Sequence, residues 1–180
     1  MIQYIRSYIV HYLIRRALAS LTRTKRVVNL AEASTIGILF SLTDEQDYHY
    51  INSIVNQLIA SGKEVKTIGF LPQKQIPNYY IAKLKMDIIT PKDVNWLGIS
   101  KKPFVESFIQ EEFDLLIDLN AGDCLALDYI SGLSHANFKT GRYSEKMIQV
   151  FDFMIKRSEG MESKRFSETV IGYLRTINTN

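Results

Sequence analysis

Residues 35–42, TIGILFSL, form a short continuous apolar run, as expected of a β-strand that is buried on both faces. After a polar turn, residues 46–61 carry apolar side chains at helical spacing, and Gly62 follows where a glycine often ends a helix. Residues 64–70 are again rich in β-forming residues. The three segments predict a β-α-β unit, in which the two strands are parallel and the connection between them is right-handed.

The same alternation continues to the end of the chain. Apolar or β-rich runs predict strands over residues 86–89, 113–119, 138–141 and 149–155. Helical patterns cover residues 103–112, 124–131 and 163–177, with a further stretch near residues 79–85. Asp123 and Ser163 are predicted to be helix N-caps, and Trp96 is predicted to pack beneath a loop. Strands that alternate with helices in this way predict one doubly wound, mostly parallel, Rossmann-like α/β sheet.

The composition is that of a globular protein that needs no disulfide or structural metal. The chain has 180 residues, 46% of them hydrophobic, and its single cysteine, Cys124, cannot form an internal disulfide. No apolar stretch reaches the length of about 20 residues that a membrane-spanning helix needs, and a secretory signal fits badly. We therefore expect a cytoplasmic protein with no integral membrane segment. Its basic helix and linker are predicted over residues 1–30, and its Rossmann-like domain over residues 31–180.

The charge of the chain is distributed unevenly. Six of its 22 Lys and Arg residues lie in the leader, residues 1–26, and the first acidic residue is Glu32. The leader therefore carries +6, and the remaining 16 basic and 19 acidic residues give the body a net charge of −3. Such a leader favours an anionic partner: RNA, anionic lipid, an acidic protein, or the acidic body of its own domain.

The leader is predicted to be a helix over residues 2–21, because this stretch has no Gly or Pro. Its apolar stripe comprises Ile2, Ile5, Ile9, Leu13, Ala17 and Leu21. A second stripe is aromatic and basic, with Tyr4, Tyr8, His11 and Arg15. The helix can pack on its own domain, dock on RNA by base stacking and phosphate pairing, or lie on a membrane surface. The candidate partner-binding residues are Tyr4, Arg6, Tyr8, His11, Arg15, Arg16, Arg23, Lys25 and Arg26.

A candidate ligand site follows from the predicted sheet. In open α/β sheets, ligands bind beyond the carboxyl ends of the strands, where the strand order reverses. If the strands at residues 35–42 and 113–119 are neighbours, the residues that line this crevice are Ser41, Thr43, Asp44, Asn120, Gly122, Asp123, Cys124 and Arg142. A small anionic or polar ligand could bind there, at the start of the helix near Cys124. In the alternative interpretation, the aspartates cap helices and Asn120 shapes a turn.

The motifs of several enzyme classes are absent from the sequence. No glycine-rich phosphate loop follows the first predicted strand, and no P-loop, nucleophile-elbow or zinc-protease motif is present. The three histidines are scattered along the chain, and the aspartates near residue 118 match no metal-binding loop. Cys124 could be a nucleophile at the start of a helix or a buried structural thiol. We therefore predict no cofactor and no metal, and binding rather than catalysis.

Four segments carry a resemblance to known sequences: residues 35–40, 113–120, 134–141 and 173–178. Together they resemble a family of uncharacterised cytoplasmic proteins from Bacteroidetes, over nearly the whole chain. This resemblance implies a fold and a bacterial source, but no activity. Residues 113–119 and 136–141 are also similar to the N-terminal half of heptosyltransferase-type glycosyltransferases. Sugar transfer is not expected, because the turn at residues 42–46 lacks the glycine of those enzymes and 180 residues leave no room for their donor-binding domain.

The leading functional hypothesis is a non-catalytic α/β binding or accessory protein. Its basic N-terminal helix would dock on an anionic assembly, with RNA or the ribosome as the first candidate. One alternative is a small-ligand-binding domain or enzyme that uses the crevice near Asp44, Asn120, Asp123 and Arg142. The other is a peripheral membrane protein. The sequence does not determine the oligomeric state.

Overall fold

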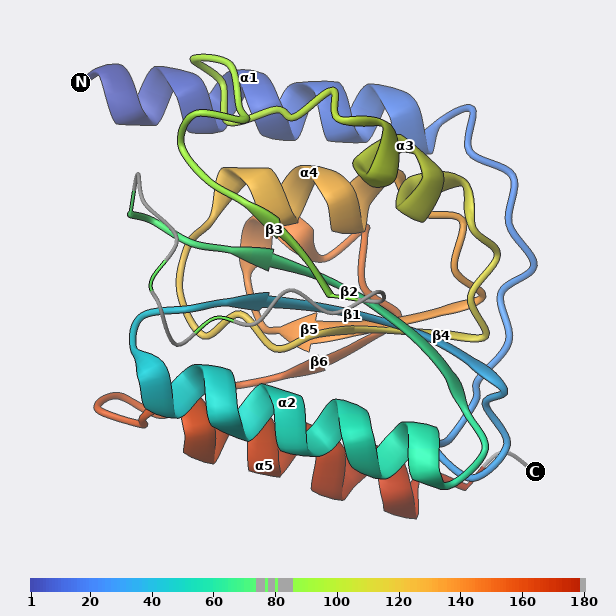
Figure 1. Cartoon of the computed structure of the whole chain (residues 1–180). Coiled ribbons are helices and arrows are strands. Elements are labelled where there is room, and N and C mark those ends of the chain that lie inside the picture. Colours follow the sequence, from blue (N-terminus) through green and yellow to red (C-terminus); the bar gives the residue numbers. More distant parts are fainter. Residues whose placement is uncertain (74–76, 78–79, 81–85, 179–180) are drawn as a thin grey trace.

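In the computed structural model, which describes residues 1–73, 77, 80 and 86–178, six strands form one parallel sheet (Figure 1). The strand order is β3-β2-β1-β4-β5-β6. The strands are β1 (Thr35–Ser41), β2 (Glu64–Phe70), β3 (Met86–Ile89), β4 (Leu115–Asp118), β5 (Phe138–Arg142) and β6 (Phe153–Ile155). The predicted doubly wound, Rossmann-like sheet is confirmed. The stretch near residues 79–85 lies almost wholly outside the described residues.

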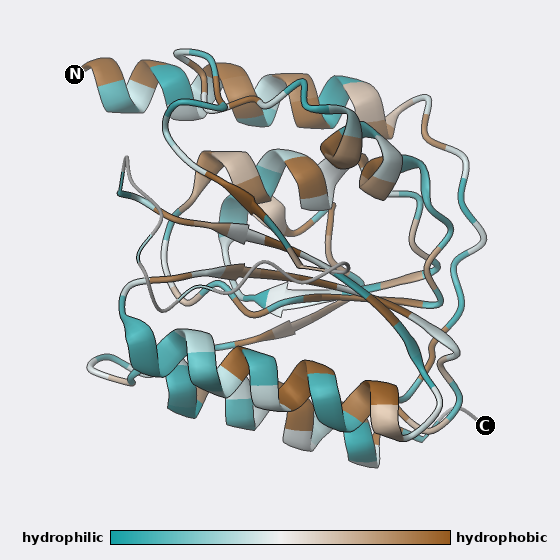
Figure 2. Ribbon diagram, viewed as in Figure 1, coloured by the Kyte–Doolittle hydropathy of each residue, from teal (hydrophilic) through white to brown (hydrophobic). Residues whose placement is uncertain are grey.

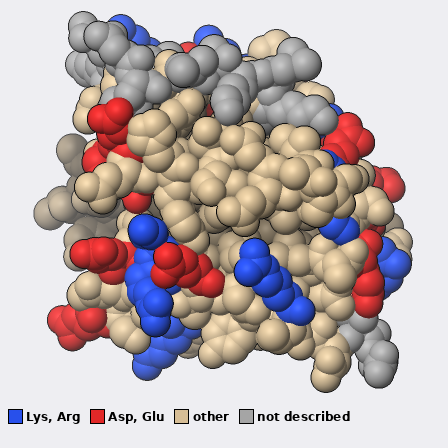
Figure 3. Space-filling model, turned by 60° about the horizontal axis from the view of Figure 1, so that its bottom comes forward, with Lys and Arg blue, Asp and Glu red and all other residues tan. Residues whose placement is uncertain are grey.

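Helices cover both faces of the sheet (Figure 1). On one face lie α1 (Ile2–Leu18), α3 (Pro103–Gln110) and α4 (Leu125–Leu133), and on the other lie α2 (Glu45–Ala60) and α5 (Ser163–Thr176). Hydropathy follows this layering, with apolar central strands and hydrophilic outer sides on α2 and α5 (Figure 2). Basic and acidic side chains lie close together on parts of the face formed by α2 and α5 (Figure 3).

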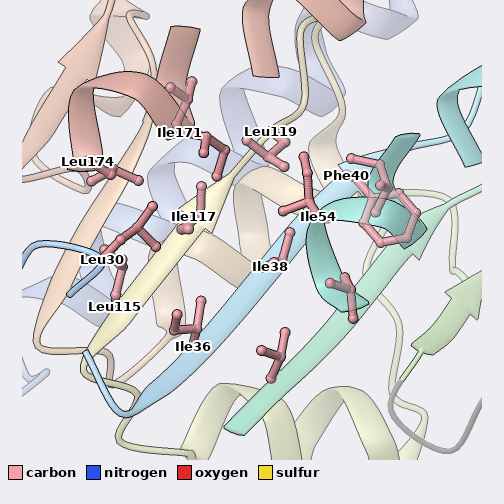
Figure 4. Close-up of a cluster of buried hydrophobic side chains, with 14 of the residues drawn as sticks. Leu30, Ile36, Ile38, Phe40, Ile54, Leu115, Ile117, Leu119, Ile171 and Leu174 are labelled. Carbon is pink, nitrogen blue, oxygen red and sulfur yellow. The ribbon is translucent and has the colours of Figure 1, made fainter. Parts of the chain in front are cut away.

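The core lies on both faces of β1 and β4, because alternate side chains of a strand point to opposite sides. Ile36, Ile38 and Phe40 pack toward α2 and α5, together with residues such as Ile54 and Ile171 (Figure 4). On the other face, Leu39 and Leu116 join the cluster that contains α3 and α4. Every residue of β4 is buried, and so are the five central residues of β1. A strand that is apolar on both faces produces this pattern.

Two details of the prediction are wrong. The predicted strand over residues 149–155 is reduced to Phe153–Ile155, because the N–H groups of Val150 and Phe151 turn back to the carbonyl of Met147. A short 3-10 helix, η1 (Glu145–Met147), precedes this turn. Trp96 does not pack beneath a loop: it is 62% exposed, and its neighbour Leu97 turns inward instead.

The predicted helix caps are also displaced. Cys124, not Asp123, is the N-cap residue of α4, because Asp123 turns away to form an ion pair with Arg142. Glu162 is the N-cap residue of α5, and Ser163 is the first residue of that helix. The boundaries of the other predicted elements agree to within a few residues, which is the ordinary precision of helix and strand ends.

Candidate functional site

A crevice of about 760 Å³ opens beyond the carboxyl ends of β1 and β4. The two strands are neighbours, and the strand order reverses between them, so the crevice lies at the switch point of the sheet. Loops after β2, β3 and β6 contribute further walls, and the first two turns of α1 lie beside the opening with Ile2, Gln3 and Arg6. Predicted and observed crevices therefore have the same place in the fold.

Six of the eight predicted crevice residues line it: Ser41, Thr43, Asn120, Gly122, Asp123 and Cys124. The Ser41 hydroxyl donates a hydrogen bond of 2.8 Å to Asn120 Oδ1, which joins the ends of β1 and β4. Asn120 Nδ2 donates to the carbonyl of Gly122 at 2.6 Å. Asn120 thus shapes the turn, as the alternative interpretation predicted, and it does so inside the crevice.

Asp44 and Arg142 lie outside the crevice lining. Asp44 caps α2, with its side chain accepting a hydrogen bond of 2.9 Å from the N–H of Asp47. Arg142 forms an ion pair with Asp123 and donates to the carbonyl of Gly122 at 3.3 Å. It therefore fixes the loop after β4, and it neutralises the charge of Asp123.

The start of α2 is acidic. Asp44, Glu45 and Asp47 stand there, and Asp47 accepts hydrogen bonds from the N–H and the hydroxyl of Thr43. A Rossmann dinucleotide-binding protein places the pyrophosphate at this helix N-terminus. Here carboxylates already occupy that place, so the start of α2 repels a phosphate.

Two arginines bring positive charge to the crevice, and they come from opposite ends of the chain. Arg157 follows β6 and donates hydrogen bonds to the carbonyls of Ala121, at 3.0 Å, and Met161. Arg6 comes from α1. Both Nε atoms are buried, and within the described residues neither has a hydrogen-bond partner. The sequence pointed to Arg6 for a partner surface and gave no signal for Arg157, because neither position belongs to a local motif of the crevice.

Cys124 is not activated. Burial raises the pKa of its thiol to about 12, although N–H groups at the start of α4 act in the opposite direction. A thiolate is the nucleophilic form of cysteine, and this thiol stays protonated at neutral pH. This pKa favours the structural interpretation of Cys124.

Helix α1 packs on α4, as one of the three alternatives for the leader predicted. Its inner face is formed by Val10, His11 and Ile14, which are buried. Gly132 of α4 allows this close approach, since a Cβ atom there would lie 2.6 Å from Ile14 Cγ2. The predicted apolar stripe is rotated away from this contact: Ile2 and Ile5 are exposed, and His11 belongs to the buried side instead of the aromatic stripe.

His11 locks α1 onto α4 by an ion pair. Its Nε2 lies 3.4 Å from Asp128 Oδ2, and its Nδ1 donates to the carbonyl of Ser7 at 2.7 Å. The nearby carboxylate of Asp128 raises the pKa of His11. Ser7 Oγ is also near, at 3.4 Å, but Nδ1 is committed to the carbonyl and cannot take the hydroxyl proton. The Ser-His-Asp group is therefore a structural lock and not a hydrolytic triad.

The body of the domain engages half of the basic residues of the leader. Arg23 binds Asp152 through two hydrogen bonds, of 2.7 and 2.8 Å, and its side chain is only 4% exposed. Lys25 lies 3.7 Å from Asp152, and Arg26 lies 3.3 Å from Asp114. These three candidate partner-binding residues therefore hold the segment after α1 against the acidic body.

A buried polar chain links β4, α4 and β5. Asp118 accepts hydrogen bonds from the N–H of Asn120, at 2.9 Å, and from the hydroxyl of Ser131, at 3.2 Å. Lys139 Nζ donates to the carbonyls of Ser131 and Gly132 at the end of α4. Burial raises the pKa of Asp118 to about 7 and lowers the pKa of Lys139 to about 7. No sequence pattern pointed to Lys139.

The described part of the chain offers neither a metal centre nor a membrane-spanning helix. No group of three or more His, Cys, Asp or Glu side chains there could hold a metal ion. Within the same residues, no helix has the length and apolarity that crossing a bilayer requires.

Comparison with protein families shows a match over most of the chain. The model of a family described as a family of unknown function, DUF6913, matches residues 6–177. No curated protein and no solved structure matches the chain. The predicted resemblance to an uncharacterised family is therefore confirmed, while the bacterial source and the similarity to glycosyltransferases stay predictions.

Proposed function

The chain belongs to a family of unknown function, DUF6913, and we propose that it binds a small anionic molecule with an apolar body in the switch-point crevice. The observation that carries this proposal is the charge of the crevice wall. Arg6 and Arg157 line it with unpartnered, buried Nε atoms, and the carboxylate of Asp123 is paired with Arg142.

The electrostatics of the wall favour an anion near α4. Both arginines are half-buried, and the Nε–H group of each is buried without an acceptor, which is costly; a carboxylate or phosphate supplies such an acceptor. The first N–H groups of α4 lie at the same end, where the helix dipole also favours negative charge. The acidic start of α2 excludes the dinucleotide geometry, so we place the anionic group on the β4 side of the crevice.

The other half of the crevice is apolar. Phe70 ends β2 and Pro72 follows it, while Pro91 and Val94 follow β3, and all four line the wall. A largely apolar pocket with a few convergent polar groups is typical of small-molecule sites. The ligand would therefore lie with its apolar body over the ends of β2 and β3 and its anionic group toward α4.

The residues that line the crevice favour ligand binding over catalysis. The described lining residues include no His, Lys or Glu, and the thiol of Cys124 stays protonated at neutral pH. General acid-base chemistry needs a group whose pKa lies near the working pH. Asp118, with a pKa of about 7, is buried beneath the loop and does not line the crevice.

Matched ligand pairs test the proposal by thermal shift and isothermal titration calorimetry. We expect phenyl phosphate and octanoate to stabilise the protein, and their neutral counterparts phenol and octanol to do so weakly. A ligand at about 100 times its Kd stabilises by roughly 2.7 kcal/mol, which is a readily measured shift. Arg6→Gln and Arg157→Gln should each weaken anion binding at least about tenfold, because each removes a charge-assisted bond of about 1.5–3 kcal/mol.

The control is Arg165→Gln, which removes an arginine that is 73% exposed on α5 and lies outside the crevice. It should leave binding unchanged. Equal binding of the neutral and anionic members of each pair, or anion binding that survives both crevice substitutions, would contradict the proposal.

Docking of the leader on RNA stays a prediction with fewer residues to support it. Three of the six leader cations bind the body of the domain, and Arg6 lines the crevice. The affinity of a protein for RNA rises with the number of phosphates that its cations neutralise. For this reason we place the crevice first.

A further inference from the structure

The outer face of α1 carries apolar and aromatic side chains on the surface of the protein. It is formed by Met1, Ile2, Tyr4, Ile5, Tyr8 and Tyr12, which are between 51% and 97% exposed. Tyr4, Tyr8 and Tyr12 recur at every fourth residue, so they form one row along the helix. A contiguous exposed apolar surface marks an interaction site.

The charge along this face has one sign. No acidic residue precedes Glu32, and Arg15 and Arg16 continue the outer face toward the end of α1. Both arginines are exposed, and no ion pair involves them within the described residues. An anionic partner therefore complements the face.

Trp96 adds a further exposed aromatic side chain close to α1. Its neighbour Leu97 packs on the cluster that contains Val10 and Ile14 of α1, so the loop that holds Trp96 lies against the helix. Trp96 itself is 62% exposed. Tryptophan and tyrosine are the residues that accumulate at the boundary between water and lipid.

We propose that the outer face of α1, together with Trp96, docks the protein on the surface of an anionic lipid bilayer. The helix is an outermost element of the fold and lies along its surface (Figure 1). Its 17 residues span about 25 Å, and an interfacial helix enters the bilayer by only about 5–10 Å. The apolar and aromatic side chains enter the headgroup boundary, while Arg15 and Arg16 pair with lipid phosphates.

Two other partners fit this face less well. RNA would leave the aliphatic side chains of Met1, Ile2 and Ile5 without a partner, and α1 itself has only Arg15 and Arg16 as exposed cations to pair with phosphates. In a symmetric pair of copies, the outer face would meet the same face of the second copy, which carries the same positive sign. A lipid surface satisfies the aliphatic, aromatic and basic side chains together.

The packing of α1 also explains why its apolar residues do not lie on a single side of the helix. One apolar side, with Val10 and Ile14, faces α4, and a second, with Ile5 and Tyr8, faces outward. An ordinary surface helix is apolar on one side and polar on the other, and a helix with two apolar sides lacks that contrast. Apolar residues on two sides are therefore compatible with a helix that binds both α4 and a bilayer.

Vesicle cosedimentation of the full chain tests the proposal. We expect binding to vesicles made of equal parts phosphatidylcholine and phosphatidylglycerol, and little binding to pure phosphatidylcholine. Arg15→Gln with Arg16→Gln should weaken binding to the anionic vesicles roughly 25-fold, because each basic residue near such a surface contributes about fivefold. Tyr8→Ser with Ile5→Ser should weaken it at least about tenfold, because apolar area no longer enters the boundary.

Control substitutions on the opposite face of the sheet are Arg175→Gln and Ile59→Ser, which should change nothing. All variants alter exposed side chains, and a thermal melt of each confirms that it stays folded. Three outcomes would overturn the proposal: no binding of the natural sequence to anionic vesicles at low salt, binding that is indifferent to Tyr8→Ser with Ile5→Ser, or binding to RNA that needs Arg15 and Arg16 while vesicles are ignored. None of the substituted residues lines the crevice, so either proposal can fail alone.

Discussion

Replacing Gly132 by alanine should loosen α1 from α4. A Cβ atom at this position would lie 2.6 Å from Ile14 Cγ2 and 2.9 Å from Ile14 Cγ1. Ile14 is 1% exposed and β-branched, so its side chain has little freedom to move aside, and the helices must separate instead. Overpacking of this kind costs about 1–3 kcal/mol, and the helix preference of Ala over Gly offsets up to about 1 kcal/mol.

We therefore expect Gly132→Ala to lower the free energy of unfolding by up to about 2 kcal/mol, measured by urea denaturation. Gly172→Ala is the matched control, because Gly172 also lies in a helix, α5, and its Cβ would meet nothing within 4 Å. That substitution should stabilise the protein by about 0.5–1 kcal/mol. The opposite signs separate the steric effect from helix preference.

A double-mutant cycle with Ile14→Ala identifies the contact. Alone, Ile14→Ala should cost about 2–5 kcal/mol, because it leaves a cavity in the α1–α4 contact. In the Gly132→Ala background it should cost about 1–3 kcal/mol less, because the new methyl group fills that cavity and the clash is gone. Additivity of the two effects to within about 0.3–0.5 kcal/mol would show that Ile14 does not contact position 132, and would refute the described packing of α1.

Three other substitutions test single interactions. His11→Gln should destabilise the protein by roughly 1.5–3 kcal/mol in acid and by less in alkali. Because the pKa of His11 is raised, the stabilisation by His11 is complete below pH 6.5 and is lost as the pH rises through the pKa of the folded state. Urea denaturation at a series of pH values measures this difference. The folded protein holds the proton of Asp118 up to about pH 7, so the natural protein should lose a few kcal/mol of stability as the pH rises from about 4 to about 7, at about 1.4 kcal/mol for each unit of pKa shift. Asp118→Asn should abolish this loss, and an unchanged dependence of stability on pH would contradict the burial of Asp118. Asp44→Ala should cost about 1 kcal/mol by removing the N-cap of α2, and Asp44→Asn should keep most of it, as thermal melts would show.

The fold could be predicted from the sequence because its central strands are apolar on both faces. The runs at residues 35–42 and 64–70 match β1 and β2 almost residue for residue, and their spacing indicated a parallel sheet. The crevice followed from the same argument, since its position depends only on which strands are neighbours. Ser41 and Asn120 were found because Ser41 ends β1 and Asn120 follows β4 by two residues.

The contacts between distant segments could not be predicted. Arg157 enters the crevice from a loop after β6, and Lys139 caps the end of α4 from β5, so no local pattern marks either. The periodicity of apolar residues predicted the helix α1, but the predicted apolar stripe lies roughly a quarter turn or more away from the side that is buried. Gly132 and Asp128 of α4 decide that side, and they lie far along the chain.

The attachment of α1 has a consequence for the order in which the protein folds. The leader is synthesised before the residues that anchor it: Arg23 and its partner Asp152 lie 129 residues apart. Both apolar sides of α1 are therefore expected to be exposed to solvent until the sheet has formed. In this period a nascent chain is most prone to aggregation and to binding other surfaces. Because the docking of α1 closes a long loop, we expect it to be a late event of folding and its release to be an early step of partial unfolding.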